Sequence, residues 1–230
     1  VALTVGTTGA MRVLSERPAP DVPTGLWAYR LGRTRTLLGG SFSEGGNVVQ
    51  WALDNLNLPP IDQLNSELEK LKPAQHRINV LPFIAGERAT GWSTSASGVL
   101  EGIRISTTPM EILQAMLESI AYRFALVADL LLPGVKSGYQ MIASGGAIQD
   151  FPWWLQTMSD VLGVPVGVSA EEQDTSRGTA ILALNALGVW AGLDMHPARI
   201  AANYEPNKVH AELHTEARER QGELYSRLLG

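Results

Sequence analysis

The 230-residue chain contains no cysteine. This excludes disulfide bonds, zinc sites with thiolate ligands and cysteine nucleophiles, and it agrees with a reducing cytoplasm as the predicted location. The longest apolar stretches fall short of the ~18 residues that a membrane span needs, so we expect no membrane association. Runs of Lys and Arg with interleaved aromatic residues are also missing, and the formal net charge is −5. We therefore expect no nucleic-acid partner.

Three sequence motifs of common enzyme classes are absent as well. The chain has no Gly-x-Ser-x-Gly, no Gly-x-Gly-x-x-Gly and no Walker A pattern. Their absence disfavours α/β-hydrolases, dinucleotide-dependent oxidoreductases and P-loop kinases respectively. A hydrophobic content of 45% is nevertheless ample for the core of a large globular domain.

The first half of the chain is rich in short β-type runs. A hairpin is predicted from residues 1–5 and 10–14 around the turn Gly6-Thr7-Thr8-Gly9, because apolar and β-branched residues flank small turn residues. Further strands are expected at 25–31, 35–38 and 81–84, and helices at 47–56 and 61–71.

The second half alternates between helical and strand patterns. Thr108-Pro109-Met110-Glu111 combines a capping box with proline at the first helical position, and it predicts a buried central helix to about residue 132. We then expect strands at 139–143 and 164–168, and helices at 153–162, 180–187 (buried) and 211–229 (charged). Antiparallel strands followed by alternating helices and strands predict an α/β fold, a mixed sheet with helices on both faces, which suits a ribonuclease H-like unit.

The most informative stretch runs from Ser144 to Leu155, where an apolar strand ends in a glycine turn and a helix begins. Glycine has no Cβ, so Gly145 and Gly146 would let a flat ligand such as adenine lie against the backbone. The alternative is a tight connection between strand and helix that binds nothing, and this turn alone does not decide between the two.

Several segments together resemble the C-terminal domain of the FGGY carbohydrate kinases, over about residues 1 to 190. The segments are Gly98–Ile103 with Glu111-Ile112 and Ala115–Glu118, which match the second family signature, the hairpin turn Gly6–Gly9, the turn Gly145–Ala147 before Trp154–Gln156, and Gly86-Glu87-Arg88 with Trp92. The chain departs from the family at Ala89-Thr90-Gly91, where a proline and an aromatic residue are usual.

The resemblance implies an actin-like ATPase fold, with residues 1–230 as one nucleotide-binding domain of an ATP-dependent sugar kinase. It implies ATP as cofactor, with Mg²⁺ held through the phosphates rather than by residues of this chain. The sugar or sugar acid would be bound together with an N-terminal domain upstream of Val1, which would also supply the catalytic aspartate. We therefore expect no catalytic residue here, and no activity of the chain alone. A non-catalytic nucleotide- or sugar-binding regulatory domain is the alternative.

The resemblance also assigns site residues. Gly6, Thr7 and Thr8 would face the β- and γ-phosphates, with an ordinary hairpin turn as the alternative. Gly145 and Gly146 would lie beside the adenine, and Asp150 would hydrogen-bond the base or the ribose.

Asp150 and a further candidate, Gly102, have structural alternatives as well. Asp150 could instead cap the following helix. Gly102 would belong to the wall of the nucleotide site, or it is simply a glycine at the entry to a helix.

Two side-chain pairs are given structural interpretations. His210 and His214 have a spacing that can hold zinc, but Glu212 is misplaced for a zinc-protease motif and no third ligand is apparent, so we expect a solvated helix face. Trp153-Trp154 is interpreted as core packing, with a subunit contact in a homodimer as the alternative.

Overall fold

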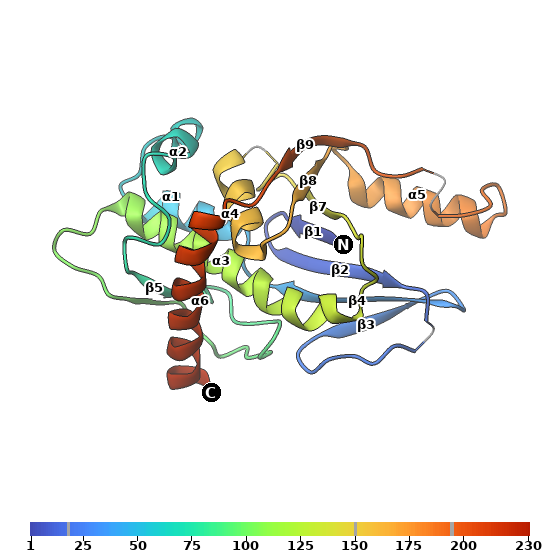
Figure 1. The fold of residues 1–230 in the computed structure, drawn as a ribbon, viewed down its shortest axis with the longest axis horizontal. Coiled ribbons are helices and arrows are strands. Elements are labelled where there is room, and N and C mark those ends of the chain that lie inside the picture. The colour runs from blue at the N-terminus through green and yellow to red at the C-terminus, as the bar shows by residue number, and fades with distance from the viewer. Residues whose placement is uncertain (18, 150, 194–195) are drawn as a thin grey trace.

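The computed structural model describes residues 1–17, 19–149, 151–193 and 196–230. Its strands are β1 (Ala2–Val5), β2 (Gly9–Ser15), β3 (Trp27–Leu31), β4 (Arg35–Phe42), β5 (Asn79–Leu81), β6 (Val99–Glu101), β7 (Met141–Ser144), β8 (Val166–Ser169) and β9 (Ile200–Tyr204). Its helices are α1 (Gly46–Asn55), α2 (Ile61–Leu68), α3 (Pro109–Leu131), the short 3₁₀ helix η1 (Leu132–Gly134), α4 (Pro152–Leu162), α5 (Asp174–Ala186) and α6 (Lys208–Leu229). Figure 1 shows their arrangement.

The main sheet has seven strands in the order β3-β4-β2-β1-β7-β8-β9. β1 pairs antiparallel with β2 and parallel with β7, and β7 pairs parallel with β8. This is the predicted mixed sheet, because the consecutive hairpins come first in the chain and the crossovers through helices come later. Where the antiparallel and parallel halves meet, the carboxyl ends of β1 and β7 lie next to each other.

The long helix α3 forms the centre of the molecule. The predicted capping box is present, with Thr108 accepting a hydrogen bond from the Glu111 N–H and the Glu111 carboxylate accepting one from the Thr108 N–H. Most of α3 between Leu113 and Leu131 is buried, and Trp154 of α4 donates from its indole to the Leu117 carbonyl. Trp154 is fully buried, which confirms its interpretation as a packing residue.

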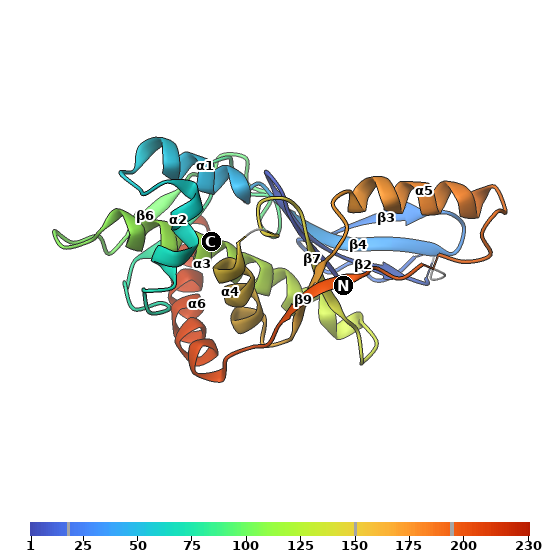
Figure 2. The ribbon, with the colours of Figure 1, turned by 90° about the horizontal axis from the view of Figure 1, so that it is seen from above.

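Helix α5 overlaps the predicted helix at 180–187 but begins six residues earlier, at Asp174, and the prediction that it is buried is wrong. None of its residues is buried, and Leu182 is 38% exposed. Figure 2 shows α5 and the C-terminal end of α3 on opposite sides of the sheet, with α5 standing off at one end of the molecule. An apolar run in a helix predicts that the helix packs against an apolar surface. The periodicity of the run does not show whether that surface belongs to this chain. The helix ends just before Gly188, whose φ of 72° is the left-handed conformation common after a helix C-terminus.

Apart from shifts of one or two residues at strand ends, the strands differ from the prediction in three respects. The strand predicted at 81–84 lies earlier, as β5, because Pro82 has no N–H to continue the ladder. Its partner β6 and the edge strand β9 were not predicted, since three to five residues give little periodic signal. β4 continues beyond residue 38 to Phe42, through Gly39 and Gly40, because both of its neighbours pair with it.

A buried carboxylate ties the central helix to the loop after α2. Glu118 Oε1 accepts hydrogen bonds from the Ala74 N–H at 3.1 Å and the Gln114 amide at 3.0 Å. Its Oε2 accepts from His76 Nε2 at 3.1 Å and the Tyr122 hydroxyl at 3.2 Å. Four donors therefore surround a side chain that water does not reach, which is the condition for burying a carboxylate without a large cost.

The cluster extends to α6 and corrects the prediction for its histidines. His214 is 2% exposed, and its Nδ1 lies 3.0 Å from the Tyr122 oxygen, to which it donates because the Tyr122 proton is directed at Glu118. Burial lowers the pKa of His214. His210 Nδ1 lies 3.0 Å from Asp160 Oδ2 on α4. The two histidines therefore join α6 to α3 and α4 instead of facing solvent. Among the described residues, no group of three His, Asp or Glu side chains could hold a metal ion.

No helix within the described parts of the chain is both long enough and apolar enough to cross a membrane.

Candidate functional site

The hairpin turn between β1 and β2 is fixed to the N-terminus of α1. The Gly46 N–H donates to the Gly6 carbonyl at 2.7 Å, and the Asn47 N–H donates to the Thr7 carbonyl at 3.1 Å. Gly45 permits this close approach, because a Cβ there would lie 2.9 Å from the Gly6 carbonyl oxygen and 3.0 Å from that of Thr7. The helix N-terminus thus uses two of its free N–H groups to hold the turn in place.

The same turn leaves donors unused. Within the described residues, no hydrogen-bond partner is found for the N–H groups or the hydroxyls of Thr7 and Thr8. Both residues are exposed. Successive free N–H groups and hydroxyls on a rigid turn are suited to binding an anion such as a polyphosphate.

The glycine turn after β7 docks against the end of β1. Gly145 has φ 105°, and a Cβ there would lie 2.4 Å from the Val5 carbonyl oxygen, so glycine is required for conformation and for space. The Ala147 N–H donates to that same oxygen at 3.2 Å. The turn is therefore held rigidly beside the hairpin turn.

Gly146 and Gly6 have the opposite property. A Cβ at either position would meet nothing within 4 Å, and neither has a left-handed backbone conformation. Both residues line one cavity of about 780 Å³, together with Thr7, Gly46, Asn47, Gln50, Trp51, Asp54, Ile84 and Ala147. Packing within the chain does not require glycine at these two positions. Because Gly6 and Gly146 have no side chain, a ligand in the cavity has room to lie against the backbone.

The structure brings Gly6, Thr7 and Gly146 together on this cavity. Gly145 supports the turn from behind, and Thr8 faces a second cavity described below. Gly102 does not line either cavity. It follows β6 with φ 88°, and a Cβ there would lie 2.7 Å from the Arg77 carbonyl oxygen, which favours its structural alternative. Asp150 lies outside the described residues.

Sequence reasoning missed the contribution of α1 to the cavity. Gln50, Trp51 and Asp54 lie on successive turns of its exposed side, and Gln50 Nε2 donates to Asp54 Oδ1 at 2.8 Å. The available signal was the pair Gly45-Gly46 immediately before a helix, the arrangement that lets backbone approach a helix N-terminus.

A second, smaller cavity of about 290 Å³ also reaches the hairpin turn, at Thr8. Its lining comprises Thr8, Ser43, Asn47, Ala85, Gly86, Glu87, Arg88 and Thr94. Asn47 lines both cavities. The two spaces therefore meet at the hairpin turn and the start of α1.

Glu44 is buried beside this second cavity. It is 2% exposed, and its Oε1 has no hydrogen-bond partner among the described residues. Burial raises the pKa of Glu44 to about 7, an effect that nearby Glu87 reinforces and that Arg123 and Arg88 oppose. Near neutral pH this carboxyl is therefore about half protonated.

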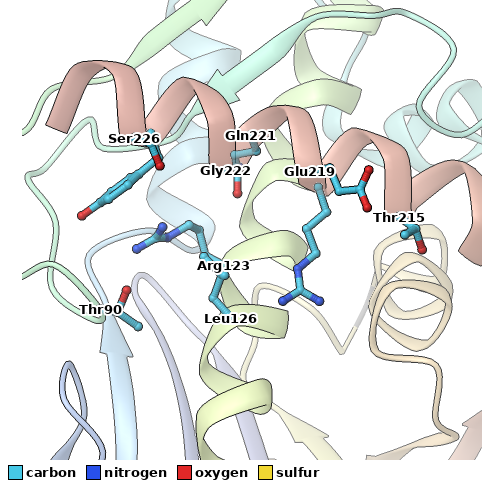
Figure 3. A pocket seen from close by; sticks show the side chains of 10 residues that line it. Thr90, Arg123, Leu126, Thr215, Glu219, Gln221, Gly222 and Ser226 are labelled. Carbon is cyan, nitrogen blue, oxygen red and sulfur yellow. The ribbon is translucent and has the colours of Figure 1, made fainter. Parts of the chain in front are cut away.

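A third cavity, of about 480 Å³, lies between α3 and α6 and is shown in Figure 3. Arg123 on α3 lines it, with its guanidinium 5.1 Å from the Phe83 ring centre and 5.2 Å from that of Tyr225. Nη2 of Arg123 donates to Glu87 and to the Ala89 carbonyl. Glu87 already balances Arg123, and Asp129 pairs with Arg218, the other arginine that lines the cavity, so the cavity offers less to an anion than the hairpin turn does.

Comparisons with known proteins show the family of the chain. The FGGY family of carbohydrate kinases, C-terminal domain, matches residues 1–187. A gluconokinase of Bacillus subtilis (strain 168) is 26% identical over 215 residues, covering 89% of this chain and 42% of its own length. A glycerol kinase of Methylobacterium nodulans is 31% identical over 210 residues, covering 86% of this chain and 40% of its own length.

Solved structures show the same fold. The gluconate kinase of Lactobacillus acidophilus superposes with a TM-score of 0.86 at 28% identity, over 99% of this chain and 47% of its own. The ligand-bound xylulose kinase of the same species gives 0.87 at 27% identity, with the same coverage. These neighbours confirm the ribonuclease H-like, actin-like ATPase fold. The chain spans about two fifths of the length of the curated relatives and just under half of the solved chains.

Proposed function

Because the chain belongs to the FGGY family of carbohydrate kinases, whose C-terminal domain it matches, we propose that it is the nucleotide-binding half of an ATP-dependent kinase. The intact enzyme would transfer the γ-phosphate to a hydroxyl of a sugar or sugar acid. One observation carries the proposal: Gly6, Thr7 and Gly146, from two turns far apart in the sequence, line a single cavity in which the donors of Thr7 are unused and neither glycine carries a Cβ.

In this proposal each turn has a separate task. The free N–H and hydroxyl groups of Thr7 and Thr8 bind the phosphates, and the hydrogen bonds from Gly46 and Asn47 keep those donors in place before the ligand arrives. Gly146 offers a flat backbone surface for the base. ATP when bound supplies the phosphoryl group, with Mg²⁺ held through its phosphates.

The acceptor side is expected to need more protein than this chain provides. The named relatives include gluconokinases and glycerol kinases roughly twice as long. We propose that an N-terminal half supplies the catalytic carboxylate and most sugar contacts, and that closure of the two halves excludes water. A cytoplasmic location accords with this chemistry.

A titration with ADP tests the nucleotide site. We expect weak binding, with dissociation constants of roughly 0.1 to 1 mM, because half a cleft makes half the contacts. Gly146→Val should reduce the affinity at least tenfold with little change in melting temperature, since its side chain would enter the cavity. Gly134→Val is the matched control, because a Cβ at Gly134 also meets nothing within 4 Å and Gly134 does not line the cavity. Unchanged ADP affinity in Gly146→Val would contradict the proposed position of the base.

The chain alone should transfer no phosphate. A coupled assay of ADP release with gluconate, xylulose, ribulose and glycerol should stay at background, because base, positioned acceptor and closed cleft are missing together. Sugar-dependent turnover that disappears in Thr7→Val would show instead that this chain is a complete enzyme.

A further inference from the structure

The two cavities at the hairpin turn differ in the kind of group they can receive. Thr7 faces the larger cavity and Thr8 the smaller one, and Asn47 lines both. A polyphosphate bound at Thr7 would therefore end near Thr8, at the entrance to the smaller cavity. At about 290 Å³ that cavity is too small for a nucleotide and is at the lower limit for a small ligand.

The loop that forms the far wall of the smaller cavity is held firmly. The Glu87 N–H donates to the Ser93 carbonyl at 2.8 Å, and the Arg88 carbonyl accepts from the Trp92 N–H at 2.6 Å. The next residue, Ala89, donates its N–H to the Ser41 carbonyl of β4 at 2.9 Å. The backbone of Arg88 is thus fixed on both sides, so its side chain is presented from a rigid position.

Among the described residues that line the smaller cavity, Arg88 is the one cation without an ion pair. Glu87 is ion-paired with the buried Arg123. Glu44 is fully buried and only partly ionised near neutral pH. Arg88 is exposed and lines the cavity, and its guanidinium has no hydrogen-bonded or ion-paired partner among the described residues. A fork of unpaired guanidinium donors beside the hydroxyls of Thr8 and Thr94 is suited to carboxylate or phosphate oxygens.

We propose that this smaller cavity, centred on Arg88, is a subsite for an anionic oxygen group next to the site of transfer. The group is either the carboxylate of a sugar-acid acceptor or a phosphoryl group. The role of this subsite in phosphoryl transfer rests on the proposed function. Its ability to bind an anion rests only on the residues that line the cavity.

Binding to the 230-residue chain by calorimetry and by NMR chemical-shift changes would test the subsite. The substances are gluconate, glycerol as a polyol without a carboxylate, inorganic phosphate, and ADP. We expect gluconate or phosphate to bind and glycerol not to bind. In Arg88→Gln the dissociation constant for the anion should rise at least tenfold, whereas the affinity for ADP should be unchanged. Arg33→Gln, at an exposed arginine of the β3–β4 turn, is the matched control and should bind as the native chain does.

A pH series gives a second measurement that a purely structural role of Arg88 would not affect. As the pH rises through 7, Glu44 becomes ionised among Arg88, Arg123 and Glu87 and reduces the positive potential. Anion affinity should therefore fall between pH 6 and pH 8 in the native chain. In Glu44→Gln this part of the pH dependence should disappear.

The outcomes separate the two sources of the anion. Gluconate binding that depends on Arg88, without phosphate binding, would identify the acceptor carboxylate, and the reverse would identify the phosphoryl group. Equal anion binding by Arg88→Gln and the native chain, or equal binding of glycerol and gluconate, would overturn the subsite.

The outcomes also separate the subsite from the proposed function. ADP binding without any anion binding would overturn the subsite and leave the proposed function standing. Anion binding without ADP binding would overturn the nucleotide site alone, and the absence of both would overturn both.

Discussion

Two polar regions of this molecule are built in opposite ways. Around Glu118, four donors surround one carboxylate, and the Tyr122 hydroxyl, which donates to Glu118, accepts from His214. At the hairpin turn, by contrast, the donors of Thr7 and Thr8 have no partner within the described chain.

A buried polar group must form its hydrogen bonds inside the protein, because water does not reach it. An exposed polar group can hydrogen-bond water until a ligand replaces that water, so leaving it without a protein partner costs little. The first region therefore stabilises the fold, and the second is available for binding. Substitutions around Glu118 should therefore change the free energy of unfolding, whereas substitutions of Thr7 or Thr8 should change the affinity for a ligand.

The largest effect is expected at Glu118. Glu118→Leu would leave the donors of Ala74, Gln114, His76 and Tyr122 buried without an acceptor, and we expect the free energy of unfolding to fall by about 4 kcal/mol or more. Urea unfolding followed by circular dichroism measures this. Glu118→Gln keeps one oxygen and should lose less. A loss under about 1 kcal/mol for Glu118→Leu would show that the cluster contributes little.

The next effect depends on pH and concerns Glu44, at the binding region. Folding raises its pKa from 4.5 to about 7, so the native state holds the proton more firmly. This contribution to stability is fully present below pH 4.5 and is lost as the pH rises through 7.

Glu44→Gln removes that loss. Between pH 5 and pH 8, the unfolding free energy of Glu44→Gln relative to the native chain should rise by about 2 to 3 kcal/mol. Denaturant unfolding of both proteins at matched pH values measures the difference. A pH-independent difference would mean that Glu44 titrates alike in the folded and unfolded chains.

A third comparison uses two adjacent glycines and gives the smallest effects. Gly145→Ala combines an unfavourable φ with a close contact to the Val5 carbonyl, and it should lower stability by about 2 kcal/mol. Gly146→Ala has free space and ordinary backbone geometry, so its unfolding free energy should stay within about 0.5 kcal/mol of the native value. Thermal melts of the pair measure this. Equal losses at both positions would mean that the turn is purely structural.

How far the sequence predicts this structure depends on how local the signals are. The β1–β2 hairpin and the start of α3 were predicted because turn glycines and a capping box act within a few residues. Two predictions of burial are wrong: His214 was expected to face solvent and is buried, and α5 was expected to be buried and is exposed. Both depend on which distant element lies opposite, and the pattern of one helix does not contain that information.

The candidate site shows the same division. The turns at Gly6 and Gly146 could be identified from the spacing of their glycines, and the family resemblance supplied their proposed ligand, ATP. The contribution of α1 and the position of Arg88 depend on how the hairpin docks onto the helix, through the Gly6 and Thr7 carbonyls. Those contacts join residues about 40 positions apart. The pair Gly45-Gly46 indicates that backbone can approach the start of α1, but it does not say which segment does so.

The two hydrogen bonds from Gly46 and Asn47 to the hairpin carbonyls also have a mechanical consequence. They join the hairpin turn to α1, which packs into the core through the buried side chains Val48, Val49 and Ala52. Thr7 and Thr8 can therefore shift only if the two hydrogen bonds break or if α1 moves with the turn.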